Sequence, residues 1–502
     1  MRLRFLRGLV ACLSIGALAP APVLGKDLAT RKWIEVSTPH FRVQSRLNEK
    51  RTVEPVRYLD LMRRTVPLIT NLEIQADPIP THVVTLSTRG ELGAFGMGQT
   101  VAGVFASGLR NNTILLRNVI GMDETHVMLH EYVHYLTATD AGFDYPLWFR
   151  EGIAEYLAGS RIEDGYFYVG VPRRESGDLR SRKWLSAEKL LDSRGYRKLR
   201  GPEVLQFYEQ SWLLVQFLLS SIDDFPGAMQ HYLEQRSAGV AETEAFEDAF
   251  GVAAPDLNQA MRTYLFNGCC KVFRLSIEAL QPDFQANVTV PDEHAVALRL
   301  GQIALRFGEE KMARRWFEYA LDSTTTRARA EAGLGDLLKF AGEYEAAEAY
   351  FDRALEAGPD DPYVQLDTAE FWLNRYLSDE AAPERDGYLS LAKKHFVASW
   401  KLDDTIPETY VFYGRSLMVS GDDYAQAVLM LEEGLRRLPT HARTRAWLAE
   451  AYARAGRVDD AVRTANSIIH LGHGNAEFAK EALALVEDIA GADATQVAGG
   501  SP

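Results

Sequence analysis

Two histidines spaced by one helical turn are the residues of this sequence best suited to chemistry. The stretch Val127–Tyr135 contains His130, Glu131 and His134, and on a helix the two histidines would face the same way. Two imidazoles placed in this way can share one tetrahedral Zn²⁺ ion. Glu131 would point near the same cavity without ligating, and it can take a proton from a zinc-activated water and pass it to a leaving group. The spacing predicts hydrolytic chemistry with one zinc ion per chain.

A second stretch supplies the ligand that this motif lacks. Pro146–Tyr156 begins twelve residues after His134 and places Glu151 and Glu155 one helical turn apart. Glu151 is expected to complete a His₂Glu set with one position open for water, as a catalytic zinc requires. Glu155 is expected to accept the free N–H of a ligating imidazole and so to fix its tautomer. The alternative is a pair of exposed helix carboxylates, which the apolar neighbours of both residues disfavour.

The region before these motifs has the pattern of a small mixed sheet with helices. Alternation of apolar and polar residues predicts strands at 33–36, 40–43, 83–86 and 113–116. Helical spacing predicts helices within 51–72, 123–160 and 202–270. The glycine-rich segment Gly90–Gly108 is expected to be a loop. Together these elements indicate an α+β domain.

From residue 294 the sequence repeats with a period of about 34 residues, which is typical of tetratricopeptide repeats. Gly301 and Gly335 begin two of the units, and each is followed at offsets of 12, 16 and 19 by Ala, Phe and Ala. A third unit carries an insertion near 379–387, and two more follow. Small residues are expected where the two helices of a pair touch. Five units predict an all-α solenoid whose concave face binds a protein partner or presents the substrate.

The paired motifs, H-E-x-x-H followed by W-x-x-E-G-x-A, resemble the gluzincins, the thermolysin-like and alanyl-aminopeptidase-like zinc peptidases. They are most similar to the bacterial peptidase MA-like domains, which often carry tetratricopeptide repeats. The resemblance covers roughly residues 30–270 and implies a gluzincin-like catalytic domain that hydrolyses a peptide or protein substrate. Phe207–Ser211 is similar to the segment that supplies the catalytic tyrosine of aminopeptidase-type gluzincins. The resemblance implies that Tyr208 donates its O–H to the oxyanion, the alternative being a core tyrosine.

Three features near these motifs narrow the hypothesis. Aminopeptidases of this kind hold the substrate's free amine with an acidic residue in a G-x-M-E-N loop, whereas Gly96–Gln99 contains no acid. An endopeptidase is therefore the better hypothesis, with Thr113–Leu116 as the edge strand that pairs with an extended substrate. His126 lies one turn before His130 and is expected to cap or pack near the helix start. The alternative is a fourth imidazole near the metal.

Composition and the chain ends set the remaining expectations. The chain has 502 residues and a formal net charge of −14 without a basic block, unlike a nucleic-acid binder. A basic start followed by a short apolar run predicts a signal peptide and export to the periplasm or medium, and no later run is apolar enough to span a membrane.

Cys269 and Cys270 are either two small apolar side chains or a disulfide between neighbours. The expected divisions are 1–25 signal peptide, 26–275 catalytic domain, 276–293 linker, 294–488 repeat array and 489–502 disordered tail.

Two other functions fit the same residues. The repeats would carry the function of a protein-binding scaffold if the zinc domain were inactive. A complete zinc site would also suit a hydrolase of non-protein amides.

Overall fold

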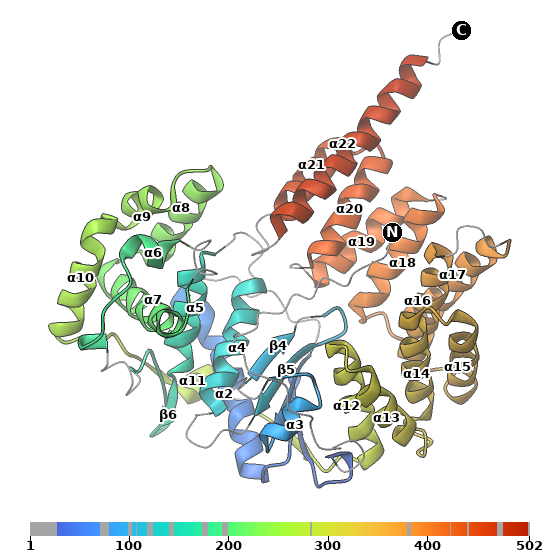
Figure 1. Cartoon of the computed structure of the whole chain (residues 1–502), viewed down its shortest axis with the longest axis horizontal. Coiled ribbons are helices and arrows are strands. Elements are labelled where there is room, and N and C mark those ends of the chain that lie inside the picture. The colour runs from blue at the N-terminus through green and yellow to red at the C-terminus, as the bar shows by residue number, and fades with distance from the viewer. Residues whose placement is uncertain are drawn as a thin grey trace. The chain divides into compact units, whose positions relative to one another are not determined.

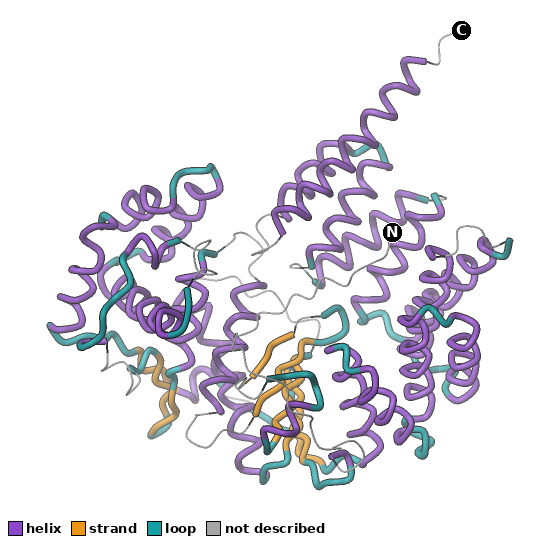
Figure 2. The backbone as a smooth tube through the Cα atoms, viewed as in Figure 1, coloured by secondary structure: helices purple, strands orange, loops and turns teal. Residues whose placement is uncertain are grey.

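The computed structural model describes most of the chain as helices and two small sheets (Figure 2). The described residues are 28–70, 80–98, 103–106, 108–117, 124–139, 145–172, 179–192, 199–281, 284–378, 383–421, 423–438, 441–468 and 475–499. The expected signal peptide at 1–25 lies outside them. Two compact units interleave in the sequence. The first comprises the described parts of Met1–Thr52, Ala76–Asn118 and Asn287–Pro502, and the second those of Val53–Gln75 and Val119–Ala286.

The first unit contains a six-stranded mixed sheet. Its strands are β1 (Ile34–Ser37), β2 (Phe41–Ser45), β3 (Thr81–Leu86), β4 (Gly103–Ala106), β5 (Asn112–Arg117) and β9 (Asn287–Thr289). They lie in the order β4-β5-β3-β2-β1-β9. β3 pairs in parallel with β2 and with β5, and the other pairs are antiparallel. The four strands expected from alternation are present, and β4 and β9 extend the sheet on its two sides.

Strand β4 corrects two expectations. The segment Gly90–Gly108 is not simply a loop, because it includes most of helix α3 (Arg89–Gly93) and the whole of β4. The segment Thr113–Leu116 is not an edge strand, because β5 lies between β4 and β3. All residues of β5 from Asn112 to Leu116 are buried, as is usual for a strand inside a sheet. The edge strand on this side of the sheet is β4.

The sheet and the first repeat share one hydrophobic core. Trp33, Leu115 and Trp316 belong to a single buried cluster, and the rings of Phe95 and Trp316 stack with centroids 5.3 Å apart. Val288 of β9 lies opposite Val36 of β1, so part of the expected linker 276–293 is a strand of this sheet. The two compact units are therefore not separated at residue 275, where the domain boundary was expected. Segments that are distant in the chain belong to one unit when their apolar faces pack together.

In the described part of the chain, five helix pairs follow the sheet and confirm the repeat prediction, and they are coloured from yellow to red in Figure 1. They are α12 (Glu293–Phe307) with α13 (Glu310–Ala320), α14 (Arg327–Ala341) with α15 (Tyr344–Ala357), α16 (Pro362–Ser378) with α17 (Arg385–Leu402), α18 (Pro407–Ser420) with α19 (Tyr424–Arg437), and α20 (Ala442–Arg454) with α21 (Val458–Ser467). The glycine anchors lie where paired helices touch. A Cβ on Gly301 would stand 2.8 Å from the ring of Phe317, and one on Gly335 would stand 2.9 Å from that of Phe351.

One further helix ends the described chain. Helix α22 (Asn475–Gly499) packs against the fifth pair, with Val486 in the same buried cluster as Leu448. The tail expected to be disordered from 489 is therefore helical as far as Gly499. The apolar residues of α22 continue the core of the array beyond the last complete repeat, so the helix covers the end of the array.

The second unit is mostly helical. Its helices are α2 (Glu49–Thr70, from Val53 onward), α4 (Glu124–Thr139), α5 (Leu147–Ala158), α6 (Ala187–Leu191), α7 (Pro202–Ser221), α8 (Phe225–Ser237), α9 (Glu242–Phe250), α10 (Ala254–Phe266) and α11 (Ile277–Leu280). Strands β6 (Arg161–Glu163), β7 (Tyr166–Val169) and β8 (Phe273–Ser276) form an antiparallel sheet. Aromatic rings join the helices, since Trp148 of α5 lies edge-to-face on Phe246 of α9 with centroids 5.8 Å apart.

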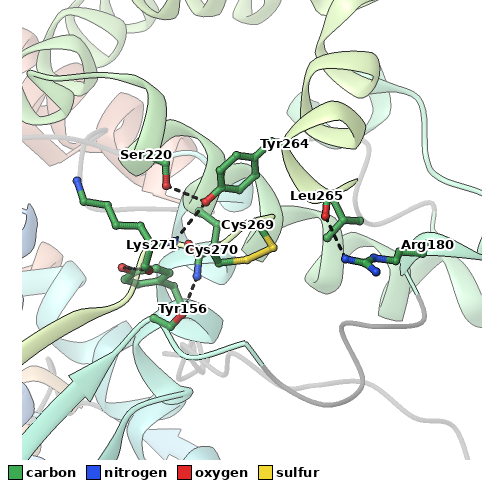
Figure 3. Close-up of a disulfide and its surroundings, with 10 residues drawn as sticks. Tyr156, Arg180, Ser220, Tyr264, Leu265, Cys269, Cys270 and Lys271 are labelled. Carbon is green, nitrogen blue, oxygen red and sulfur yellow. Dashed lines mark hydrogen bonds between the residues drawn. A yellow bond between two sulfur atoms is a disulfide. The ribbon is translucent and has the colours of Figure 1, made fainter. Parts of the chain in front are cut away.

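The two adjacent cysteines form a disulfide in this unit (Figure 3). The Sγ atoms of Cys269 and Cys270 are 2.14 Å apart, in the turn between α10 and β8. The N–H of Lys271 donates to the hydroxyl of Tyr264 over 3.4 Å, and that hydroxyl lies 2.8 Å from Oγ of Ser220. These contacts tie the cysteine turn to α10 and α7. Of the two expectations for the cysteines, the structure has the disulfide.

Among the described residues, no helix is both long enough and apolar enough to cross a bilayer.

Candidate metal centre

Helix α4 presents three histidines on one side. His126, His130 and His134 follow each other at intervals of four residues, and each is at least nine-tenths buried. The residues between them include Leu129 and Val133, which are fully buried in the unit. A helix that is apolar on its other sides is fixed in rotation by that packing. The histidine face is thereby held toward the neighbouring helix.

Helix α5 brings the two glutamates to the same place. It begins after Pro146, whose extended backbone precedes the first turn, and Glu151 and Glu155 lie one turn apart within it. A Cβ on Gly152 would lie only 2.3 Å from the backbone oxygen of Ser211 in α7. Helices α5 and α7 therefore approach each other more closely than any side chain at position 152 would allow.

This close approach predicts a loss of stability in the Gly152→Ala variant. The added methyl group must push α5 away from the α7 backbone, and overpacking of this kind costs about 1–3 kcal/mol. The matched control is Gly387→Ala in α17, where a Cβ meets nothing within 4 Å. Circular dichroism melting should show a lower transition midpoint for Gly152→Ala and no decrease for the control. An unchanged midpoint for Gly152→Ala would contradict the packing.

Three side-chain atoms from α4 and α5 form a small triangle. Nε2 of His130 and Nε2 of His134 are 3.1 Å apart. Oε2 of Glu151 lies 3.5 Å from the first nitrogen and 3.3 Å from the second. Tetrahedral zinc with bonds of about 2.0–2.1 Å holds its ligand atoms about 3.3 Å from one another. The three separations therefore fit a shared zinc ion.

Two buried polar atoms of Glu151 and His134 lack a hydrogen bond within the ranges that the structure describes. Oε2 of Glu151 and Nδ1 of His134 are buried, and neither has a hydrogen-bond partner among the described residues. A buried polar atom without a partner costs about 1–3 kcal/mol, so such atoms call for an explanation. A cation between the two imidazoles would account for the orientation of the carboxylate toward them.

The charges of the triangle depend on one another. Burial opposes protonation of His130, but its contacts with Glu151 and Glu155 prevail and raise the pKa of His130 well above its ordinary value. Burial likewise opposes ionisation of Glu151, but His134 and His130 lower the pKa of the Glu151 carboxyl far below its ordinary value. The buried carboxylate of Glu151 and the imidazole of His130 thus each stabilise the charged form of the other.

Glu131 lies beside the triangle but outside it. It is buried, and its Oε2 has no hydrogen-bond partner in the described part of the chain. Burial raises the pKa of the Glu131 carboxyl against the opposing influence of His130 and His134. A carboxyl group whose pKa is shifted toward neutrality is suited to accept and return a proton.

Glu155 links two histidines of α4. Its Oε1 lies 3.3 Å from Nδ1 of His130, and its Oε2 lies 3.3 Å from Nε2 of His126. His126 is thus not one of the three residues of the triangle, and it packs near the start of α4 in contact with Glu155. Among the described residues, His126, His130 and Glu155 form a second group with metal-ligand spacing. The four-residue interval before His130 was the sequence signal for this contact.

Tyr208 comes to the site from α7. Its ring lies near that of His130, with centroids 6.3 Å apart and planes inclined by 53°. The side chain is half-buried, unlike the fully buried Phe207 next to it. The structure thus brings all six residues named from the sequence, His130, Glu131, His134, Glu151, Glu155 and Tyr208, into three neighbouring helices of one unit.

Comparison with known proteins identifies two stretches of the C-terminal helices. Tetratricopeptide-repeat family models match residues 328–371 and 419–489. The C-terminal region is a tetratricopeptide-repeat array. Neither matched range includes the residues of the candidate metal centre, and a search of curated proteins found no match.

Two solved structures are similar to the chain. A thermophilic TPR protein from Thermus thermophilus is 20% identical, with a TM-score of 0.33, and the match covers 38% of this chain and 98% of that one. A tetratricopeptide repeat protein from Parabacteroides merdae is 15% identical, with a TM-score of 0.28, and the match covers 53% and 91%.

Proposed function

We propose that the chain is a zinc-dependent peptidase, more specifically an endopeptidase, that hydrolyses peptide or protein substrates. The observation that carries the proposal is the triangle of His130, His134 and Glu151, whose ligand atoms are separated by 3.1–3.5 Å. The resemblance of these motifs to the gluzincins supports the same chemistry. The chain is proposed to act after export to the periplasm or the medium, which the basic and apolar start of the sequence supports.

The residues around the triangle would divide the reaction among them. A zinc ion held there would supply a Lewis acid that makes water acidic near neutral pH. Glu131 would accept the proton of the attacking water and deliver it to the leaving nitrogen. Tyr208 would donate its hydroxyl hydrogen to the oxyanion of the tetrahedral intermediate. Glu155 would hold the proton on Nδ1 of His130 and keep Nε2 available as a ligand atom.

The repeat array supports a protein-binding role beside this chemistry. Tetratricopeptide repeats present extended surfaces to polypeptide partners, which gives the chain a means to select proteins. An endopeptidase is favoured over an aminopeptidase because Gly96–Gln99 contains no acid that could hold a substrate amine. The leading alternative is a protein-binding scaffold whose metallopeptidase-like domain is inactive. A hydrolase of non-protein amides is the third possibility.

Metal analysis tests the proposal directly. Purified chain should contain about one zinc ion per molecule, and it should cleave an unfolded protein such as reduced casein. A chelator such as 1,10-phenanthroline should remove both the zinc and the cleavage, and added zinc should restore both. Mass spectrometry of the metal content and a gel assay measure these outcomes. If the protein binds zinc stoichiometrically but cleaves neither proteins nor amides, the scaffold function is the remaining candidate. If the purified protein contains no zinc, the proposed metal site is refuted.

A further inference from the structure

The repeat array already holds a segment of its own chain. The loop before β5, described over Gly108–Asn111 and called here the β4–β5 loop, belongs to the same compact unit as the array. The loop contacts α12, α16 and α18, which are the first helices of three pairs. The surface that these helices turn toward the loop is called here the inner face of the array. These contacts are independent of the zinc site.

Arg110 makes the main polar contacts of the loop. Its Nε donates to Oε2 of Glu408 over 2.7 Å, and its Nη2 donates to Oδ1 of Asp367 over 2.6 Å. The guanidinium also lies 5.1 Å from the ring centroid of Tyr363. One arginine thus joins α16 and α18 by two charge-assisted hydrogen bonds and a cation–π contact.

The neighbours of Arg110 complete the attachment. Leu109 packs on a small apolar cluster made by Val411 and Leu438. Nη1 of Arg306 in α12 donates to the backbone oxygen of Asn111 over 3.1 Å. A Cβ on Gly108 would lie 2.6 Å from the same guanidinium, so the loop approaches α12 with its bare backbone. An aliphatic side chain, an arginine and a backbone carbonyl are recognised together, as in peptide binding.

The inner face without the loop would carry an excess of negative charge. Asp367, Glu370 and Glu408 surround the position of the Arg110 guanidinium, with Oε1 of Glu370 3.9 Å from Nη2. The pKa of the Glu370 carboxyl is raised well above its ordinary value, mainly because the group is buried and secondly because the charge of Glu408 is close. The buried ammonium of Lys339 also acts on Glu370 and Asp367, but it is already paired with Asp336 over 2.5 Å. Buried carboxylates need a cation or a proton beside them, so the face without Arg110 would select a basic ligand.

We infer that the inner face of the array is a binding site for an extended segment with an aliphatic residue followed by arginine. The β4–β5 loop occupies this site in cis, and a protein partner with the same two side chains reaches it by displacing the loop. The inference rests on the binding role of the repeats and not on zinc chemistry. Its failure would leave the peptidase proposal untouched.

A labelled peptide tests the inference on the full-length chain. The probe is the acetylated and amidated peptide with the sequence of Ala106–Thr113, and fluorescence anisotropy measures its binding. The wild-type chain should bind weakly, because its own loop competes and reduces the fraction of open sites. Arg110→Ala frees the site, and the dissociation constant should fall by about tenfold or more. The control is Arg463→Ala, which removes an arginine whose side chain is 71% exposed on α21 and should leave binding at the wild-type level.

Two further measurements keep the result decisive. Arg110→Gln provides a variant of similar length if the alanine variant does not fold, as judged by circular dichroism. In either background, Asp367→Asn combined with Glu408→Gln should abolish binding, and a peptide with alanine in place of arginine should not bind. The inference is overturned if folded Arg110 variants bind the peptide no more tightly than the wild type. It is also overturned if the alanine peptide binds equally well.

Discussion

Replacing Glu131 by glutamine is expected to abolish proteolysis and to leave zinc bound. Glutamine keeps the size of the side chain but cannot accept a proton from the attacking water. Loss of a positioned general base lowers the rate by about 10²–10⁴-fold. The three ligand atoms belong to other residues, so the triangle stays intact. Cleavage of reduced casein and the zinc content of both proteins provide the measurement.

A matched variant separates this effect from a general loss of charge. Glu163→Gln removes a carboxylate whose side chain is 52% exposed, from β6 of the same unit, and it should cleave at the wild-type rate. A digest of a cell extract with wild type and with Glu131→Gln would then identify the natural class of substrate. Equal cleavage by the wild type and by Glu131→Gln would contradict the assignment of Glu131 as the general base.

Replacing Glu151 by glutamine is expected to release zinc. The amide is a weaker ligand than the carboxylate, and it removes the negative charge that the cation needs. Loss of a residue that only orients a ligand costs about 10–100-fold in metal affinity, so loss of a ligand should exceed about 100-fold. Competition with a chromogenic chelator gives the zinc dissociation constant, and circular dichroism verifies that the variant is folded.

Glu155→Gln is the informative comparison for this variant. Glu155 sits one turn along the same helix and contacts Nδ1 of His130, so its replacement should weaken zinc binding by only about 10–100-fold. The opposite order of effects would reverse the two roles. Zinc would then belong to the second group of His126, His130 and Glu155, and the triangle would lose its assignment.

The repeat array was largely predictable from the sequence. Its units recur in nearly equal spacing, and each unit packs mainly on its neighbours, so a local pattern carries most of the structural information. Gly301 and Phe317 illustrate this, because the spacing of sixteen residues is the reach from one helix of a pair to the facing point on the other. The helical end at Gly499 escaped prediction because a small, alanine-rich segment lacks a strong apolar stripe.

The positions of the candidate metal ligands were predictable for a similar reason. His130 and His134 lie on one helix, and Glu151 and Glu155 on the next, so the helical period alone sets their faces. The sheet was harder to predict. β4 and β9 are short, and Val288 becomes a strand residue only because it lies opposite Val36. Strand pairing joins segments that are distant in sequence, and no local pattern records which ones meet.

The sequence by itself determined the residue types, the helical spacing of the candidate ligands and the five repeats, because these features depend on intervals within single helices or adjacent ones. Only the tertiary structure decided that Glu151 lies 3.3–3.5 Å from both imidazoles, that Glu155 contacts His126, and that Arg110 occupies the inner face of the array. These contacts join separate elements, and the one made by Arg110 spans more than two hundred residues. Such contacts arise from the packing of whole elements. No regular spacing along the chain relates the residues that make them.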